Sequence, residues 1–400
     1  MSVISVVVPL YNAENTINKC LDSILAQTFS DIEIICVNDG STDNTGSILD
    51  EYARLHSNVV VIHIENSGVT VARKIGIAKA SGEYIGFVDG DDWIEKEMFS
   101  KLYEAIVKHK ADMVCSGYYF EGDYVSECYD GVDEGLYSDD GIRYLCDNAI
   151  YNVDTRQVGL RSTIWCKLFS AEIVQEIQRE MMDELSFSED KVLILLFLMK
   201  CQRVYVLHEA YYHYVKNSQS TVNKPNFNYL LSINDLYKQL RLMYGYERFS
   251  EKMRAQAEIY ITELLYKGIN SRMGFERSNL LWIDPYWLEQ FPKNSKLYLY
   301  GVGELCKTYL KQLRTSERFE YMGCIDYDFE KHANDELKPG NPSVLKNSVY
   351  DFVVVTIKNK SKAADIQKQL VEDGIPVDKI KWFDQTEIFW RFAEANGWFK

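Results

Sequence analysis

Three aspartates within four residues are the side chains of this sequence that are best suited to take part in chemistry. Asp89, Asp91 and Asp92 directly follow the short apolar run 84–88. Clustered carboxylates are costly unless a cation, a ligand bridged by a cation, or solvent offsets their charge. In an extended segment Asp89 and Asp91 point the same way, so the pair could hold one divalent ion. Mg²⁺ or Mn²⁺ bound in this manner usually bridges to phosphate.

The same tetrapeptide, 89–92, also has purely structural explanations. An Asp-Gly pair is common in tight turns, and either of the last two aspartates could cap a helix that begins near Glu95. A calcium-binding EF-hand loop is excluded, because it needs glycine at its sixth position and glutamate at its twelfth. Those positions hold Ile94 and Ser100. The tetrapeptide alone therefore leaves a turn or cap and a metal site equally open.

The surrounding sequence alternates strand patterns with helix patterns, which predicts a mostly parallel sheet covered on both faces. In such sheets, ligands bind beyond the carboxyl ends of the strands. Asn12, Asp39 and the 89–92 cluster all follow predicted strands, so we expect them to share one rim. The predicted strands span 5–8, 32–37, 59–64, 84–88 and 113–116, and the predicted helices lie near 17–25, 42–52, 69–80 and 98–107.

A chain of 400 residues is too long for one ordinary core, so we expect two or three domains. The predicted organisation is an α/β domain at 1–225, a helical linker at 226–292, and a small Rossmann-like α/β domain at 293–400. In the last of these, strand patterns recur near 297–300, 321–325, 352–357 and 380–383.

Four motifs occur in a characteristic order: Val8–Asn12, Val37–Asp43, Gly68–Arg73 and Phe87–Asp92. Over roughly residues 1–220 the chain closely resembles the bacterial GT-A family 2 glycosyltransferases. The resemblance implies a GT-A fold and an inverting transfer of a sugar from a UDP-sugar donor to a hydroxyl of a glycan or lipid-linked glycan acceptor. It also implies a Mn²⁺ or Mg²⁺ cofactor, which would offset the charge that grows on the diphosphate leaving group.

The resemblance assigns the donor site residue by residue. Asp39 would accept a hydrogen bond from uracil, and Arg73 would lie near the nucleotide and diphosphate; the position after it, usually asparagine in the family, is Lys74. The metal and ribose motif corresponds to Asp89, Asp91 and Asp92, with Asp91 as the foremost metal ligand and Asp89 also on the nucleotide side. The loop that shapes the nucleotide pocket comprises Pro9, Tyr11 and Asn12.

The reaction also needs a base for the acceptor hydroxyl, and Glu189-Asp190 is the candidate pair. It precedes the apolar segment 192–199, so a structural explanation is helix capping favoured by the helix dipole. The family resemblance instead implies that Asp190 is the base and that Glu189 orients the acceptor or the base.

The segment 211–216 resembles the part of the family that closes over the diphosphate. Lys216 could supply positive charge there, although lysine cannot reproduce a bidentate arginine contact. His213 is a candidate metal or phosphate ligand, but a lone histidine among aromatic residues is more often packed. Trp165 and Lys167 could line the acceptor side or could simply pack in the core.

The last α/β segment carries a partial dinucleotide fingerprint. Gly301 and Gly303 follow a predicted strand and precede a helix, but Cys306 replaces the third glycine. Asp326 ends the next strand, where a ribose-binding acid is expected. Nucleotide binding and a ligand-free structural or assembly role both stay open. Aromatic residues within 389–399 are expected to pack on their own domain rather than on a membrane or partner.

Composition excludes some classes of partner. The formal net charge of −15 argues against nucleic-acid binding, which depends on basic side chains meeting phosphates. None of the nine cysteines has CxxC spacing, and their scatter suggests buried thiols in a reducing compartment. The sequence starts directly with a strand pattern, so we expect no signal peptide. The expected location is the cytoplasm, including the inner face of the membrane.

Three functional hypotheses follow. The first is a metal-dependent glycosyltransferase of bacterial surface polysaccharide or glycoconjugate synthesis, with peripheral membrane association and homo-oligomer formation left open. The second is an NAD-dependent sugar-modifying enzyme that uses the last α/β domain. Against it, no Tyr-x-x-x-Lys pair occurs in 296–400. The third is a catalytically inert nucleotide-sugar-binding scaffold.

Overall fold

The chain forms two compact units, Met1–Gly274 and Phe275–Lys400. The computed structural model describes residues 2–122, 124–150, 159–216, 229–271, 291–315, 319–333, 335, 337–357 and 359–383. The first unit includes the helices that the sequence assigned to a separate linker at 226–292. The sequence predicted boundaries at 225 and 292, whereas the structure divides the chain once, between residues 274 and 275.

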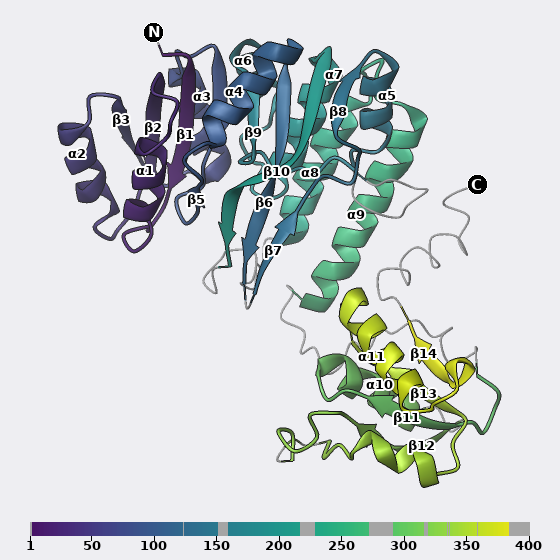
Figure 1. Cartoon of the computed structure of the whole chain (residues 1–400). Helices are drawn as coiled ribbons and strands as arrows, with labels where there is room; N and C mark the ends of the chain where they lie inside the picture. The colour runs from purple at the N-terminus through teal and green to yellow at the C-terminus, as the bar shows by residue number, and fades with distance from the viewer. Residues whose placement is uncertain are drawn as a thin grey trace. The chain divides into compact units, whose positions relative to one another are not determined.

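The first unit is built on a ten-stranded sheet, and its first four strands are parallel as predicted (Figure 1). Every residue of the first strand is buried, as expected for a strand covered on both faces. In order across the sheet, these strands are β3 (Val59–Ile64), β2 (Ile32–Asp39), β1 (Ile4–Leu10) and β4 (Tyr84–Phe87).

The rest of this sheet is mixed, although the five strands predicted within 1–116 all run in the same direction. The short strand β9 (Lys167–Ser170) lies antiparallel between β4 and β6 (Met113–Glu121), and β6 pairs in parallel with β10 (Arg203–Val215). Three short strands join antiparallel: β5 (Trp93–Ile94) and β8 (Gly135–Ser138) on β10, and β7 (Val125–Cys128) on β6. Sequence patterns near 167 gave no strand signal because the strand has four residues.

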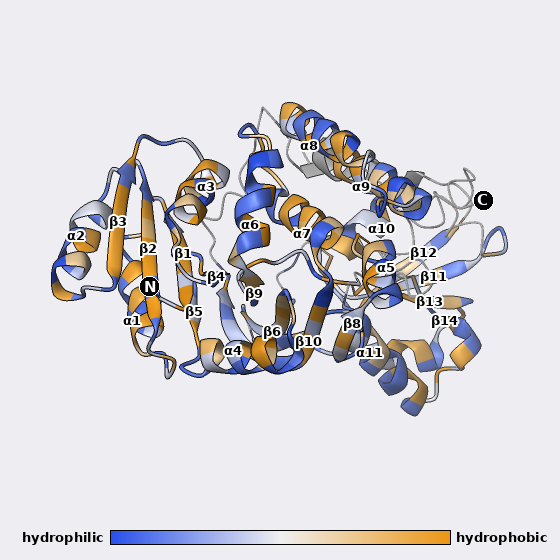
Figure 2. Ribbon diagram, turned by 90° about the horizontal axis from the view of Figure 1, so that it is seen from above, coloured by the Kyte–Doolittle hydropathy of each residue, from blue (hydrophilic) through white to orange (hydrophobic). Residues whose placement is uncertain are grey.

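Helices cover both faces of the sheet. Figures 1 and 2 show α1 (Ile17–Leu25) and α4 (Met98–His109) on one face, and α3 (Val69–Lys79), α6 (Ala171–Ile177) and α7 (Glu189–Lys200) on the other. Two further helices, α2 (Thr45–Leu55) and α5 (Asp140–Asp147), lie beside β3 and β8. The uniformly apolar helix α7 has nine buried residues, because the sheet lies on one side of it and other helices on the other.

Helix α3 lies unusually close to the sheet because its inner face carries small residues. A Cβ added at Gly76 would come within 2.4 Å of Val7 Cγ1 in β1. This close packing sets how far Arg73, one turn earlier on the same helix, lies from the sheet. The glycine thus contributes to the position of a charged side chain at the sheet rim.

Two long helices complete the first unit. Helices α8 (Tyr229–Met243) and α9 (Glu251–Ser271) pack against each other, with α8 also against α7 and α9 against α5. In Figure 2 they lie outside α7, as a further layer. Among the described residues, no helix combines the length and apolar character needed to cross a membrane.

The second unit contains a parallel four-stranded sheet, and all four of its strands match sequence expectations. The strand order is β12 (Glu320–Ile325), β11 (Lys296–Tyr300), β13 (Phe352–Val355) and β14 (Ile380–Trp382). Helices α10 (Glu304–Thr315) and α11 (Lys360–Glu372) connect consecutive strands. The aromatic segment 389–399 lies outside the described residues.

Candidate active site

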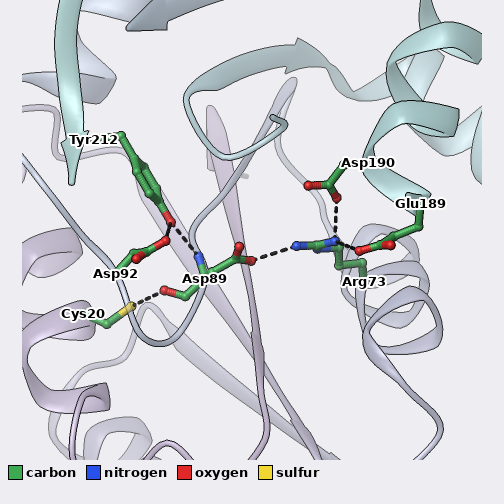
Figure 3. Close-up of polar contacts among 7 residues, drawn as sticks. All are labelled: Cys20, Arg73, Asp89, Asp92, Glu189, Asp190 and Tyr212. Atoms are coloured by element: carbon green, nitrogen blue, oxygen red, sulfur yellow. Dashed lines mark hydrogen bonds and ion pairs between the residues drawn. The ribbon is translucent and has the colours of Figure 1, made fainter. Parts of the chain in front are cut away.

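Arg73 lies at the centre of the candidate site and joins the two acidic motifs that the sequence separates by a hundred residues. Its Nη2 atom is 2.8 Å from Asp89 Oδ1, and its Nη1 atom is 2.9 Å from Glu189 Oε1 and 2.7 Å from Asp190 Oδ1 (Figure 3). The arginine comes from α3, Asp89 from the end of β4, and the Glu-Asp pair from the first turn of α7. The fold therefore gathers the predicted metal motif and the predicted base around one guanidinium.

One buried cation serves three carboxylates in this cluster. Only 7% of the Arg73 side chain is exposed, against 17–25% for its three partners. Burial alone would lower the pKa of Arg73, but Asp190, Asp89 and Glu189 outweigh it and raise the pKa. The guanidinium thus stays charged, while the cluster as a whole has an excess of carboxylates.

This excess alters the proton affinity of the candidate base. Burial raises the pKa of Asp190 to about 8; Arg73 opposes the shift, and the charges of Glu189 and Asp89 add to it. A catalytic base works best when its pKa lies near the working pH, because it must accept a proton and later release it. Asp190 therefore has a proton affinity suited to base catalysis near neutral pH.

Asp92 has a different environment from the other acids of its motif. Tyr212 Oη donates to its Oδ2 at 2.7 Å, and the backbone N–H of Val215 donates to its Oδ1 at 2.8 Å. Only 2% of Asp92 is exposed, and burial together with the charge of Asp89 raises its pKa to about 8. The same tyrosine oxygen accepts from the backbone N–H of Asp89 at 3.1 Å (Figure 3). Asp92 thus links β10 to the acidic loop.

The carboxylates of the acidic loop, residues 89–92, are the candidate ligands for a divalent ion. Among the described residues, no group of three or more His, Cys, Asp or Glu side chains is arranged to hold a metal. Both carboxylate oxygens of Asp92 accept internal hydrogen bonds, and Asp89 Oδ1 is paired with Arg73, so an ion bound by Asp89 and Asp91 would share Asp89 with the arginine. Two carboxylates suffice for Mg²⁺, which usually binds one or two of them and completes its shell with water and substrate phosphates. The donor set therefore fits such an ion.

Asp39 lies at the end of β2, buried and held by backbone groups. Its Oδ1 accepts from the Ser67 N–H at 2.6 Å and its Oδ2 from the Gly68 N–H at 2.9 Å. Gly68 has φ of +88°, a conformation that favours glycine, and this conformation directs its N–H to the carboxylate. Each carboxylate oxygen keeps a further lone pair, so Asp39 can accept one more donor.

The loop after β1 is fixed by the loop after β2. The N–H of Asn12 donates to Ser41 Oγ at 3.0 Å, and Asn12 Oδ1 accepts from the Thr42 N–H at 2.8 Å. Asn12 has φ of +51°, and asparagine tolerates this left-handed region better than most residues. Pro9 is buried in β1, whereas Tyr11 is 54% exposed, so the tyrosine ring is accessible at the rim.

Of the two downstream candidates, His213 is fully engaged. Its Nδ1 is 2.8 Å from Glu121 Oε1 and its Nε2 is 2.9 Å from Glu95 Oε1, and its ring stacks on Trp93 at 3.5 Å. It could bind a metal or phosphate only after giving up one carboxylate, so its ligand role stays a prediction. Lys216 is exposed, and its N–H donates to the Glu121 carbonyl. The segment 211–216 that was expected to close over the diphosphate comprises the end of β10 and Lys216, and it lies within the described residues.

Three other residues pack or pair inside the protein. Trp165 is 5% exposed and stacks on Tyr212, and Lys167 is fully buried, with Nζ 2.7 Å from the Thr163 carbonyl. The packing alternative is thus favoured for both over the acceptor side. Lys74 donates to the Met181 carbonyl at 2.6 Å, so it contacts the segment before α7.

Two residues that contact the acidic loop could not be predicted from sequence motifs. Tyr212 lies in a run of aromatic residues that gives no hint of which hydroxyl bonds to Asp92. Cys20 donates through Sγ to the Asp89 carbonyl at 3.6 Å, although its position on α1 marks it only as a core residue. Such pairs join residues more than sixty positions apart and have no local sequence signal.

Comparison with known proteins agrees with this geometry. The model of the family "Glycosyl transferase family 2" matches residues 5–167. Glycosyltransferase GlyA of Streptococcus pneumoniae is 34% identical over 401 residues, which cover 95% of this chain and 56% of GlyA. Glycosyltransferase GlyG of the same organism is 34% identical over 228 residues, which cover 54% of this chain and 72% of GlyG. The chain thus spans about half the length of GlyA.

The solved structures show the same fold. The crystal structure of S. aureus TarS 1-349 aligns with a TM-score of 0.53 and 21% identity, covering 69% of this chain and 74% of that one. The fold is that of a GT-A glycosyltransferase. The chain belongs to glycosyl transferase family 2. The family and fold expected from the four motifs are confirmed.

Proposed function

We propose that the protein is a metal-dependent, inverting glycosyltransferase that moves a sugar from a UDP-sugar to a hydroxyl of a glycan or lipid-linked glycan. The carrying observation is that Arg73 brings the carboxylate of the metal motif, Asp89, together with Glu189 and Asp190. Donor activation and acceptor deprotonation must occur on either side of one anomeric carbon. A single cluster that contains both kinds of acid meets that requirement.

In the proposed reaction Asp190 acts as the base. The acceptor oxygen forms a bond to the anomeric carbon, its proton passes to the Asp190 carboxylate, and the bond from the anomeric carbon to the diphosphate breaks. The electron pair of that bond leaves with UDP. A raised pKa makes Asp190 a stronger proton acceptor than an ordinary aspartate. Glu189 shares the same arginine nitrogen and orients the acceptor or the base.

The donor would bind along the rim formed by β1, β2 and β4. Asp39, with its spare lone pairs, would accept from the uracil ring, and Tyr11 and Asn12 would border the nucleotide. Arg73 and Lys216 would supply positive charge near the diphosphate. Asp91 and Asp89 would hold Mn²⁺ or Mg²⁺. Such an ion, when bound, offsets negative charge on the departing diphosphate as a Lewis acid.

Donor identity can be tested directly with purified full-length protein. TarS, which shares this fold, was crystallised with UDP-GlcNAc, so that donor heads the panel. Thermal shifts would be measured with UDP-, GDP- and dTDP-sugars and with NAD, each with and without Mn²⁺. Stabilisation by a UDP-sugar only when metal is present is expected. Stabilisation by NAD alone would contradict the proposal and favour the cofactor-enzyme alternative.

The cellular setting is a further part of this proposal. The relatives GlyA and GlyG come from a bacterium, so we propose a role in bacterial surface polysaccharide or glycoconjugate synthesis at the cytoplasmic face of the membrane. Deleting the encoding gene should remove one sugar from a surface glycan, as measured by glycan composition analysis. An unchanged glycan would argue against this setting without affecting the donor assay.

A further inference from the structure

The segment between α6 and α7, residues 178–188, leads directly into the acids Glu189 and Asp190 and is held from two sides. On one side lies α3: the Thr70 hydroxyl donates to the Leu185 carbonyl, and Lys74 Nζ donates to the Met181 carbonyl at 2.6 Å. The same helix carries Arg73, which binds both acids. The position of α3 therefore determines part of the geometry of the base.

The other side is formed by α8. Gln239 is 1% exposed and uses both ends of its amide on the segment: its Oε1 accepts from the Met182 N–H at 2.8 Å, and its Nε2 donates to the Glu180 carbonyl at 3.1 Å. Ser186 and Ser232 share a hydrogen bond between hydroxyls at 3.0 Å. A buried side chain that satisfies two backbone groups fixes the path of the chain more tightly than an apolar contact does.

Helix α9 reaches the base itself through Tyr260. The hydroxyls of Tyr260 and Ser188 share a hydrogen bond at 2.9 Å, and Lys191 Nζ lies 4.8 Å from the centroid of the Tyr260 ring. Ser188 and Lys191 are the residues on either side of Glu189 and Asp190. One tyrosine side chain thus contacts both flanks of the acid pair.

The backbone at Ser188 shows why such a contact is needed. Ser188 has φ of +58° and ψ of +27°, a left-handed conformation that is uncommon for residues other than glycine, asparagine and aspartate. Its hydroxyl makes no capping hydrogen bond to α7, although serine at a helix N-terminus usually does. The hydroxyl pairs with Tyr260 instead. Strained backbone of this kind persists only when surrounding contacts hold it.

The two helices also hold each other at this point. Tyr229 Oη on α8 donates to the Leu264 carbonyl on α9 at 2.9 Å, and the Tyr229 ring packs edge-on against Phe187 at 5.6 Å between centroids. The segment before the acids therefore contacts a helix pair that is itself cross-linked. Both helices belong to the first compact unit.

We propose that α8 and α9 are part of the catalytic unit, and that Tyr260 is a positioning residue that sets the Asp190 carboxylate through Ser188 and Lys191. The proposal rests on the proposed function, in which Asp190 is the base. Its competitor is that these contacts only stabilise the fold. The two differ in what a small change at Tyr260 does to turnover in protein that remains folded.

The test compares Tyr260→Phe with Tyr237→Phe in the full-length chain. Tyr237 is a matched control on α8, because its hydroxyl accepts a hydrogen bond from Arg241, four residues on along the same helix. For Y260F we expect kcat to fall by about 10- to 100-fold, the scale for a misplaced catalytic group. KM for the UDP-sugar and the thermal-shift response to UDP should stay close to wild type. Wild-type kcat in Y260F would overturn the proposal.

A second variant separates backbone strain from the Tyr260 contact. Ser188→Gly relieves the left-handed conformation but removes the hydroxyl. If the hydrogen bond positions the base, S188G should lose kcat as Y260F does. Full activity in S188G would show that the backbone conformation alone suffices, and would overturn the role of Tyr260.

Amide hydrogen exchange gives a readout that does not depend on transfer. Peptides covering 186–192 should exchange faster in Y260F than in Y237F or wild type, since exchange follows local opening. Unchanged exchange in these peptides would overturn the proposed role of Tyr260 in holding the segment. If the wild-type protein transfers no sugar from any UDP-sugar, the proposed function fails, while the exchange comparison still decides whether Tyr260 holds this segment.

Discussion

The sheets of the two units both have parallel strands that end in polar residues, but these residues are paired differently. In the first unit, the polar residues at the strand ends are joined by long-range contacts, with Arg73 binding Asp89, Glu189 and Asp190. In the second unit they are satisfied locally. Asp326 Oδ1 accepts from the Asp328 N–H two residues on.

A contact between two neighbouring strands also shapes the second rim. Gly301 has φ of +108°, and a Cβ added there would come within 3.0 Å of Thr356 Oγ1, whose hydroxyl already donates to the Tyr300 carbonyl. The loop is thus shaped by packing between neighbouring strands. Partly buried charges that are held together at a rim indicate a functional site. Polar groups that are paired with neighbouring backbone are explained by the structure alone. Five experiments test this contrast between the two rims.

The largest expected effect belongs to Asp190→Asn. Because an amide cannot accept the acceptor proton as a carboxylate does, kcat should fall by about 10²- to 10⁴-fold, the usual contribution of a positioned base. UDP binding measured by calorimetry should be retained. Turnover near the wild-type rate would remove Asp190 from its role as base.

Removing the central cation should be the most destabilising change. In Arg73→Met three partly buried carboxylates lose their shared counter-charge, so we expect a loss near the lower end of about 3–5 kcal/mol, since the acids keep some contact with water. Urea unfolding would measure it. Arg54→Met, at a largely exposed arginine, is the control and should cost under about 1 kcal/mol. Equal midpoints for the two variants would contradict the central role of Arg73.

The two neighbouring acids of the metal motif should respond differently. Asp91→Asn should weaken the apparent affinity for Mn²⁺ more strongly than Asp92→Asn, whose effect should stay within about 10- to 100-fold, the scale for groups near a metal that do not touch it. Asp92→Asn should instead lose about 1–3 kcal/mol of stability, because the buried contact with Tyr212 is disturbed. Activity titrations with Mn²⁺ and unfolding curves give both numbers. The reverse pattern would make Asp92 the metal ligand.

The pH dependence of kcat/KM should report the raised pKa of Asp190. The base is active when deprotonated, so activity should rise with pH and reach half its maximum near pH 8. The raised pKa means that the folded protein holds this proton more tightly than the unfolded chain does. The contribution of Asp190 to stability should therefore decline as the pH rises from 3.8, the ordinary pKa of an aspartate, towards 8. A flat activity profile between pH 6 and 9 would contradict this environment.

The smallest effect should come from the second rim. Asp326→Asn disturbs a local hydrogen bond and no charge cluster, so transfer by the full-length protein should stay within about twofold of wild type, as for most surface changes. Thermal shifts with NAD and UDP on the same variant provide the control. Loss of a nucleotide-dependent shift in D326N would show that the second rim binds a ligand after all.

Much of the fold followed from local patterns. Buried strands such as β1 and β2 are continuous apolar runs, and the helical period of α1 and α4 is clear in the residues themselves. The four-residue strand β9 was missed because so short a segment carries no periodicity, although it converts the sheet from parallel to mixed. The helices α8 and α9 were predicted as helices but placed in a linker, since helical period does not say what a helix packs against.

For the site, the sequence by itself determined which acids could do chemistry and in which order they follow their strands. Asp39, Asp89, Asp91 and the Glu189-Asp190 pair were all identified from motifs. Only the tertiary structure decided how they are used. It placed Arg73 among three carboxylates, buried Asp92 against Tyr212, and set Tyr260 beside Ser188. These contacts join residues 16 to 120 positions apart, and strand and helix patterns reach only a few positions. Charge, burial and hydrogen bonding at a site depend on neighbours in space, which the order of residues does not specify.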